Sequence, residues 1–195
     1  MIKLIPSLIL CAVTVFVLEC RPTAATAADP VASHVRTSNV RVSEALRQAM
    51  AWSPSFRDLI ATLDFLDRLV YIEEGTCRPP ELRSCLHMVR NRDSKVLVVQ
   101  LATRQPTAAV VAQLAHELYH AMEIAREPGV VDDVSMRQMF ERIGYRSCVD
   151  ADTICWETRA AGAFEALVTR QVAAHGQEEL DVRTGQERHV PVVRK

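Results

Sequence analysis

The pattern of hydrophobic and polar positions predicts a helix-rich chain. "SEALRQAMAW" has helical periodicity, and Ser43 is placed to cap a helix over residues 43–52. Ser53-Pro54 breaks the pattern, and apolar residues at helical spacing then predict a second helix within "SPSFRDLIATLDFLDRLV". The spaced apolar residues of the second helix are Leu59, Leu63, Leu66 and Leu69.

Two short segments predict strands. "VYIEEG" at residues 70–75 contains β-branched and aromatic residues and ends at a glycine. "SKVLVVQLA" at residues 94–102 is the clearest strand pattern because it is rich in Val and Leu. This second strand either offers an edge to an extended peptide or lies inside the sheet, and the pattern leaves both readings open. Residues 77–85 contain Pro79-Pro80 and are expected to form a loop.

Three further helices are predicted after the second strand. Thr107 is placed to cap a helix from residue 108 to about residue 126, which ends before Pro128-Gly129. The other two cover "VSMRQMFERIG", ending at Gly144, and "TICWETRAAGAFEALVTRQVAAHG", ending at Gly176. We therefore expect an α+β fold, a compact helix-dominated domain with a small β-sheet.

One domain is predicted, with polar segments on both sides of it. The 195 residues of the chain are about the length of a single domain. Residues 43–176 are expected to form the domain. Residues 28–42 form a polar segment before it, and residues 177–195 form a polar tail with little patterning after it.

The first residues predict export. "LIPSLILCAVTVFVL" is almost wholly apolar, and it is shorter than the about 20 residues of a membrane span. Ala25-Thr26-Ala27 is a small-x-small site of the kind that signal peptidase accepts, so residues 1–27 are predicted to be a signal peptide. Lipid attachment at Cys20 is less favoured because the preceding residue is the charged Glu19. We expect a periplasmic or secreted protein with no membrane span after cleavage.

Four cysteines remain after the predicted cleavage, and an even number in an exported chain indicates disulfides. They stand in the close pairs "CRPPELRSC" and "CVDADTIC", which favours local bridges between Cys77 and Cys85 and between Cys148 and Cys155. Structural zinc pairs have shorter spacings, so a zinc knuckle is disfavoured. The formal net charge of −1 and the absence of basic runs argue against a nucleic-acid partner.

Two histidines and a glutamate stand together in "AQLAHELYHAMEIA". On an α-helix, His116 and His120 are about 40° apart around the axis and about 6 Å apart along it, so both rings can reach one ion. The neighbouring Glu117 is placed to act on a water as general base. The spacing therefore predicts a metal site, with two histidines buried in a helical core as the alternative.

A catalytic zinc ion needs a further protein ligand besides two histidines. No third histidine follows at the position used by metzincins, so that class is excluded. Glu123 is expected to support a ligand or to be a solvated charge. Glu157, thirty-seven residues after His120, is the preferred third ligand, and Glu165 is its main competitor.

The stretches "LAHELYHAMEIA" and "WETRAA" resemble the gluzincin group of zinc metallopeptidases. In particular they resemble small exported bacterial proteins that carry AHELxHAxE followed by ETxAA. The resemblance implies a zincin-like domain over residues 43–176 and Zn2+ as the cofactor. It carries His116, His120 and Glu157 over as zinc ligands and Glu117 as the catalytic base. It covers only the two quoted stretches and the order of the elements.

The predicted function is hydrolysis of a peptide or protein substrate by a zinc-activated water, with Glu117 as general base. A donor for the oxyanion is also needed, and Tyr145 is favoured because it follows the helix stop at Gly144. The other donor candidates are Arg146, Tyr119 and His175. Two alternatives stay open: an inactive zinc-binding or regulatory module of the cell envelope, and a purely structural helical domain.

Overall fold

The computed structural model describes residues 34–66, 68–78, 81–91, 94–149 and 154–184. The predicted signal peptide at 1–27, the alternative lipid attachment at Cys20 and the end of the predicted tail lie outside these residues. None of the helices within the described ranges is long and apolar enough to cross a membrane.

A mixed sheet forms one part of the fold, with strand order β1-β2-β4-β3. Its strands are β1 (Val35–Thr37), β2 (Leu69–Glu74), β3 (Ser84–Asn91) and β4 (Ser94–Leu101). The first three in spatial order run parallel, and β3 pairs antiparallel with β4. The strands predicted at 70–75 and 94–102 are therefore confirmed as β2 and β4.

The sequence pattern misses β1 and β3. β1 lies in the 28–42 segment, and β3 begins at Ser84, inside the region predicted to be a loop. "SCLHMVRN" mixes polar and apolar residues, so its strand conformation depends on pairing with the Val- and Leu-rich β4. Because β4 lies between β2 and β3, it is an inner strand, and the edge of the sheet on this side belongs to β3.

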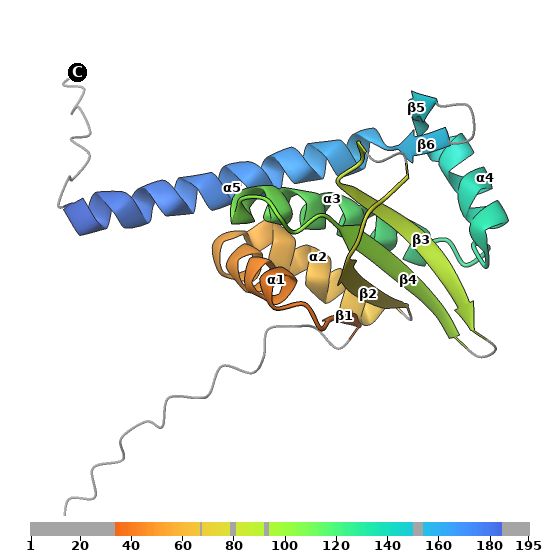
Figure 1. Cartoon of the computed structure of the whole chain (residues 1–195), viewed down its shortest axis with the longest axis horizontal. Coiled ribbons are helices and arrows are strands. Elements are labelled where there is room, and N and C mark those ends of the chain that lie inside the picture. The colour runs from red at the N-terminus through yellow and green to blue at the C-terminus, as the bar shows by residue number, and fades with distance from the viewer. Residues whose placement is uncertain (1–33, 67, 79–80, 92–93, 150–153, 185–195) are drawn as a thin grey trace, which may run out of the picture.

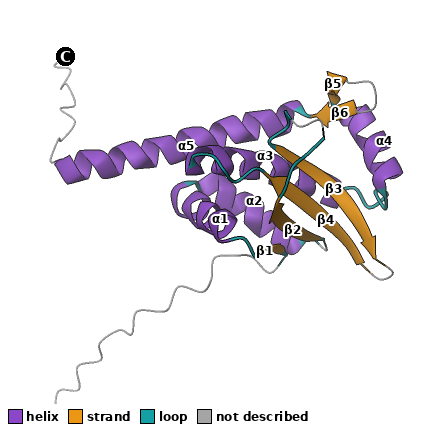
Figure 2. Cartoon of the chain, in the orientation of Figure 1, coloured by secondary structure: helices purple, strands orange, loops and turns teal. Residues whose placement is uncertain are grey.

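Helices dominate the molecule, and several of them pack against the sheet (Figures 1 and 2). They are α1 (Val40–Trp52), α2 (Pro54–Phe65), α3 (Thr107–Ala125), α4 (Asp133–Ile143) and α5 (Arg159–Thr184). Helix α3 contacts α1, α2 and α5 as well as β3 and β4. The predicted helix-dominated α+β fold is confirmed.

Two helix caps differ from the predicted ones. Helix α1 begins before Ser43 because the side chain of Asn39 accepts hydrogen bonds from the main-chain nitrogens of Arg41 and Val42. Helix α3 includes Thr107, its N-cap is Pro106, and no side chain caps it. Since no side chain caps α3, packing of the helix against neighbouring elements has to stabilise it.

The histidine motif lies on the most buried helix of the fold. Leu114, Leu118 and Ile124 of α3 are fully buried in the core. They pack in one cluster with residues of β2 and β4, such as Ile72 and Leu97. Since helices and strands surround α3 on several sides, its side chains at the metal-site motif have a fixed position.

The segment predicted as one helix over 153–176 is a strand followed by a helix. β5 (Tyr145–Val149) and β6 (Ile154–Glu157) form an antiparallel hairpin, closed by the disulfide between Cys148 and Cys155. Helix α5 starts only at Arg159 and continues past Gly176 to Thr184. The β-branched and aromatic residues of "ICWE" and the disulfide favour the strand over the helix.

Candidate metal centre

The predicted metal ligands of α3 stand in the buried middle of the helix. The rings of His116 and His120 meet edge to face, with centroids 4.8 Å apart. His120 is buried and also packs edge-on against Phe140 of α4, at 5.2 Å between ring centroids. Both imidazoles therefore face the same point, as their spacing predicts.

Glu157, the last residue of β6, completes the group. Its Oε2 atom lies 2.8 Å from Nε2 of His116, and its Oε1 atom lies 3.0 Å from Nε2 of His120. One ligand atom from each of these three residues lies within 4.8 Å of the others, so the group could hold a metal ion. The three predicted ligands are thus brought together, although Glu157 comes from a strand and not from the predicted helix.

A carboxylate holds the second ring nitrogen of each histidine. Oε2 of Glu165 lies 2.9 Å from Nδ1 of His116, and Oε2 of Glu123 lies 2.8 Å from Nδ1 of His120. Such pairs fix the orientation of a ligating imidazole and increase its basicity. Glu165 therefore lies behind a ligand, so the structure does not place it as the third ligand, and both Nε2 atoms are left facing Glu157.

Thr158 connects the carboxylates on the two sides of the centre. Its main-chain nitrogen donates to Oε1 of Glu157 at 2.7 Å, and its hydroxyl donates to Oε1 of Glu123 at 2.9 Å. The same hydroxyl accepts from the main-chain nitrogen of Ala161, at the start of α5. The buried Thr158 thus couples the start of α5 to one ligand and to the partner of another.

Gly144 permits the close approach that positions Glu157. A Cβ atom at Gly144 would lie 2.5 Å from the main-chain oxygen of Glu157 and 2.9 Å from that of Phe140. These distances leave no room for any side chain. The C-terminus of α4 therefore packs directly on the backbone that carries the third ligand.

The charges of the centre favour protonated histidines and an ionised Glu157. Burial lowers the pKa of His120, but hydrogen bonds to Glu123 and Glu157 outweigh this effect and raise it to about 9. The pKa of His116 is also raised, because its bond to Glu157 and the charge of Glu117 outweigh burial. Burial alone would raise the pKa of Glu157, whereas the two histidines lower it to about 2. A bound metal ion would replace protons on these histidines.

Glu117 is buried beside the two histidines and has a raised pKa. Burial raises the pKa, while the positive charges of His120 and His116 and a hydrogen bond with Ser84 of β3 oppose this effect. A raised pKa makes a carboxylate a stronger proton acceptor than an exposed glutamate. Its environment therefore fits the predicted role of general base.

A cavity of about 580 Å³ opens onto the centre. Its walls include the three candidate ligands and Glu117, together with residues of β3, α4 and β6. The walls include apolar residues such as Leu86, Met136 and Phe140 as well as polar ones. A cavity of this size and mixed lining can accept several residues of an extended chain or another small ligand.

The four candidate oxyanion donors do not line this cavity among the described residues. Tyr145 begins β5, pairs with Glu157 across the hairpin and is 48% exposed. Arg146 lies over the ring of Trp156, Tyr119 packs against Phe164, and His175 stacks on Trp52. The catalytic role of Tyr145 therefore stays a prediction, although its backbone lies beside a candidate ligand.

Comparison with known proteins gives no relative. No family model matches the chain, and no curated protein or solved structure matches it. The arrangement of the metal centre is therefore the basis for any functional assignment.

Of the two carboxylates that contact Nδ1 atoms, the sequence predicts a supporting role only for Glu123, with a solvated charge as the alternative. Glu123 stands three residues after His120, a spacing that places both on one face of a helix. Its contact with Nδ1 of His120 agrees with the supporting position and not with a solvated charge. Glu165 contacts His116 from another helix, forty-nine residues along the chain, and no local pattern shows such a pairing.

Proposed function

We propose that this protein is an exported zinc-dependent peptidase of compact gluzincin type. The observation that carries the proposal is the convergence of two imidazole Nε2 atoms and the carboxylate of Glu157 on one point at the wall of an open cavity. Two nitrogen donors and one carboxylate oxygen are the ligand set of known catalytic zinc sites. The resemblance of "LAHELYHAMEIA" and "WETRAA" to gluzincins supports the same assignment.

Each residue of the centre has a separate role in the proposed hydrolysis. Zinc, when bound, supplies a Lewis acid that makes water a nucleophile near neutral pH and polarises the peptide carbonyl. Glu117 takes the proton of the attacking water and later delivers it to the leaving amine. Glu123 and Glu165 hold the imidazoles of His120 and His116 in the orientation that ligation requires.

The edge of β3 provides a place for an extended substrate. Four of its residues line the cavity beside the metal centre, in a sheet where β3 pairs only with β4 among the described strands. They are Ser84, Cys85, Leu86 and His87. A peptide added to this edge would form main-chain hydrogen bonds and pass in front of Glu117.

Two observations fit an exported protein. Cys77 is bridged to Cys85 and Cys148 to Cys155, and disulfides of this kind persist in oxidising compartments. The apolar N-terminal stretch and the Ala25-Thr26-Ala27 site add the expectation of a cleaved signal peptide.

Replacing the general base tests the proposal. Zinc-loaded Glu117→Gln protein is expected to keep its zinc and to lose peptide cleavage by a factor of about 100 or more. Cleavage is measured on a mixture of peptides by mass spectrometry, with wild type and the exposed α4 variant Glu141→Gln as controls. Equal cleavage by Glu117→Gln and wild type would refute the role of Glu117. A wild type that binds zinc and cleaves no peptide would instead support the inactive metal-binding module.

A further inference from the structure

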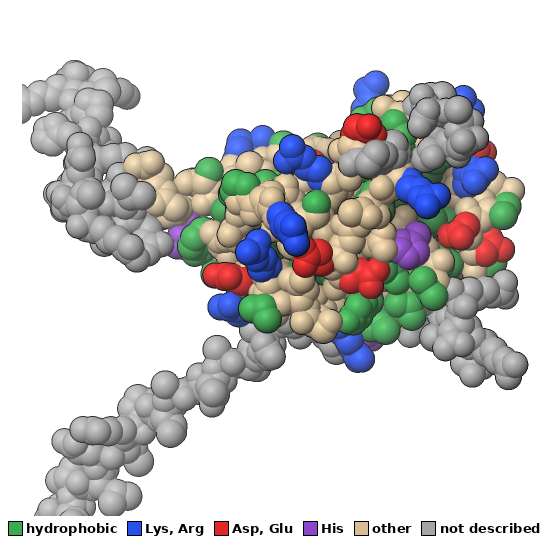
Figure 3. Space-filling view, viewed as in Figure 1, with side chains coloured by type: hydrophobic (Ala, Val, Ile, Leu, Met, Phe, Trp, Pro, Cys, Tyr) green, Lys and Arg blue, Asp and Glu red, His purple; other side chains and the backbone are tan. Residues whose placement is uncertain are grey.

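Three arginines line the cavity outside the metal centre. Arg78 and Arg83 come from the segment between β2 and β3, and Arg137 comes from α4. All three are exposed, so they can contact what enters the cavity. On the face seen in Figure 3, basic side chains gather near a histidine over the region of β3 and α4, with acidic side chains beside them.

These arginines have no ion-pair partner within the part of the chain that the structure describes. Among the described residues, the one polar contact of their side chains is from Nη1 of Arg83 to the neutral amide oxygen of Gln105, at 3.4 Å. Apart from the carboxylates of the metal centre, Asp133 is the acidic residue among the cavity walls. The carboxylates of the centre are Glu117, Glu157 and Glu165. The outer walls therefore carry an excess of positive charge.

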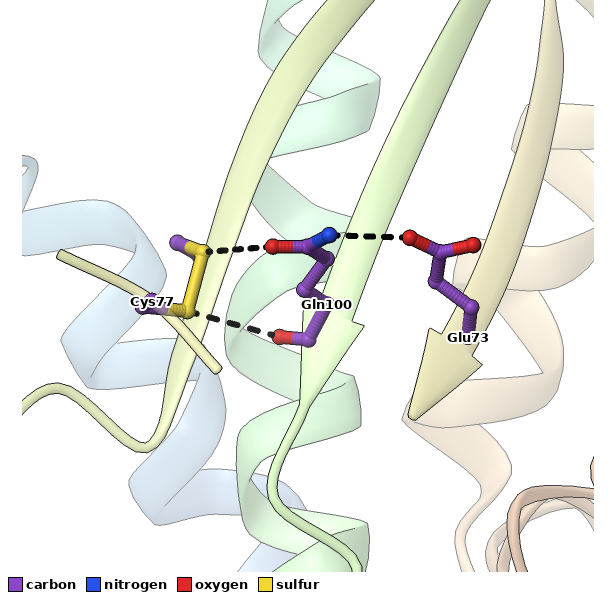
Figure 4. Close-up of a disulfide and its surroundings, with 4 residues drawn as sticks. Glu73, Cys77 and Gln100 are labelled. Atoms are coloured by element: carbon purple, nitrogen blue, oxygen red, sulfur yellow. Dashed lines mark hydrogen bonds between the residues drawn. A yellow bond between two sulfur atoms is a disulfide. The ribbon is translucent and has the colours of Figure 1, made fainter. Parts of the chain in front are cut away.

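A disulfide joins the two ends of the segment that carries two of the arginines. Cys77 and Cys85 are bridged, and their sulfur atoms contact the main-chain and side-chain oxygens of Gln100 on β4 (Figure 4). The amide nitrogen of Gln100 donates to Oε1 of Glu73 on β2, at 2.8 Å. The segment is thereby tied to the two inner strands of the sheet.

Main-chain hydrogen bonds fix the same segment at both ends. The nitrogen of Gly75 donates to the oxygen of Leu101 at 3.0 Å, and the nitrogen of Ala102 donates to the oxygen of Arg83 at 2.8 Å. Arg83 therefore starts from a fixed backbone position beside the cavity. A binding group held in place before its ligand arrives loses less entropy on binding.

We propose that the cavity selects anionic peptides, with Arg78, Arg83 and Arg137 binding a carboxylate of the substrate beside the bond to be cut. This inference rests on the proposed peptidase function and adds the class of substrate to it. A guanidinium group binds a carboxylate through charge-assisted and often paired hydrogen bonds. The carboxylate belongs either to an Asp or Glu side chain or to the C-terminus of the peptide.

Binding to the zinc-loaded Glu117→Gln protein tests the selection apart from turnover. Fluorescent decapeptides of one length, rich in Glu, in Gln or in Lys and blocked at both ends, are titrated and followed by fluorescence anisotropy. The Glu-rich peptide is expected to bind at least about tenfold more tightly than the Gln-rich one, and the difference should shrink at high salt. Equal affinities for all three peptides would overturn the inference.

A combined variant tests which residues select the charge. In the Glu117→Gln background, Arg78→Gln, Arg83→Gln and Arg137→Gln together should remove the preference for the Glu-rich peptide while the zinc content stays at one per chain. Arg170→Gln on the exposed surface of α5 is the matched control and should keep the preference. A preference that survives the combined variant would show that the zinc ion itself attracts the carboxylate, and this would overturn the role of the arginines.

A fourth peptide distinguishes the two sources of the carboxylate. A Gln-rich decapeptide with a free C-terminus gains the same advantage as the Glu-rich peptide only if the arginines bind the terminal group. Cleavage of the same peptides by the wild type then distinguishes the proposed peptidase function from the proposed selection of anionic peptides. Tight binding of the Glu-rich peptide without cleavage would refute the peptidase and leave the charge selection standing. Cleavage of all peptides at equal rates and affinities would leave the peptidase standing and refute the selection.

Discussion

Each histidine of the centre is held at one ring nitrogen and faces Glu157 with the other. Glu123 and Glu165 fix the Nδ1 atoms, and Thr158 links Glu123 to Glu157 through its hydroxyl and main-chain nitrogen. Such a network costs side-chain entropy and needs every member to be paired. The network therefore fixes the three side chains that could together hold a metal ion.

Replacing Glu123 tests the supporting network. Glu123→Ala is expected to weaken zinc binding by about 10- to 100-fold, because the orientation and basicity of His120 depend on this carboxylate. Glu165→Ala should have a smaller effect because the side chain of Glu165 is 39% exposed, compared with 13% for Glu123. Zinc affinity is measured by competition with a chromogenic chelator, with Glu141→Ala as control. An unchanged affinity for Glu123→Ala would contradict the supporting role.

The pKa shifts predict how zinc binding depends on pH. In the metal-free protein the pKa of His120 is about 9, so this ring is protonated at neutral pH, while Glu157 with its pKa of about 2 is already ionised. Zinc must displace the histidine protons, and its apparent affinity should rise as the pH increases from 6 toward about 9. Calorimetry in buffers of different ionisation enthalpy should show proton release at pH 7. Binding without proton release would contradict these raised pKa values.

At the scale of elements, the β5–β6 hairpin positions the third ligand. The disulfide Cys148–Cys155 closes the hairpin close to Glu157, and α4 ends against the backbone of Glu157 at Gly144. The other disulfide, Cys77–Cys85, holds the segment that carries Arg78 and Arg83. The two disulfides therefore support different parts of the same cavity.

Removing each disulfide in turn should separate these roles. The double variant Cys148→Ala/Cys155→Ala is expected to lose zinc affinity and about 2–3 kcal/mol of stability. The matched double variant Cys77→Ala/Cys85→Ala should lose comparable stability but keep zinc affinity, and its preference for Glu-rich peptides should fall. Thermal unfolding and chelator competition measure the two effects. Equal zinc affinity in both double variants would show that the hairpin disulfide does not position Glu157.

Gly144→Ala tests the contact between α4 and β6. The new Cβ atom would meet main-chain oxygens of Glu157 and Phe140, so the backbone at the third ligand must shift. We expect a loss of about 1–3 kcal/mol of stability and weaker zinc binding. Gly162→Ala in α5 is the matched control, because nothing lies within 4 Å of its added Cβ and alanine favours a helix over glycine. Zinc affinity is measured by the same chelator competition. Equal zinc affinities of Gly144→Ala and Gly162→Ala would contradict the role of this contact in positioning Glu157.

At the scale of the whole molecule, local patterns predict the fold class and miss the contacts between distant segments. The strand β4 is predicted by its own Val- and Leu-rich sequence. The helix α3 is predicted by its helix-compatible residues. The hairpin β5–β6 is missed because "ICWETRAA" is interpreted as part of one helix, although the predicted bridge between Cys148 and Cys155 fits two paired strands. β3 likewise depends on pairing with β4.

The sequence predicts the candidate ligands of the site, but it does not predict the residues that surround them. His116, His120 and Glu157 follow from the spacing on α3 and from the resemblance to gluzincins. The contact between Glu165 and His116 joins segments that are far apart in the chain. The arginines of the cavity walls also come from separate segments. Such contacts depend on how α5, α4 and the β2–β3 segment pack around α3, which no local sequence pattern specifies.

The zinc content of purified protein tests the central claim most directly. After incubation with zinc and dialysis, the wild type is expected to hold about one zinc per chain by mass spectrometry of the metal, as the centre offers a single ligand set. Under the same conditions His116→Ala and Glu157→Ala should each hold far less, while Glu141→Ala holds as much as the wild type. A wild type without zinc, or a His116→Ala protein that keeps a full equivalent, would contradict the account.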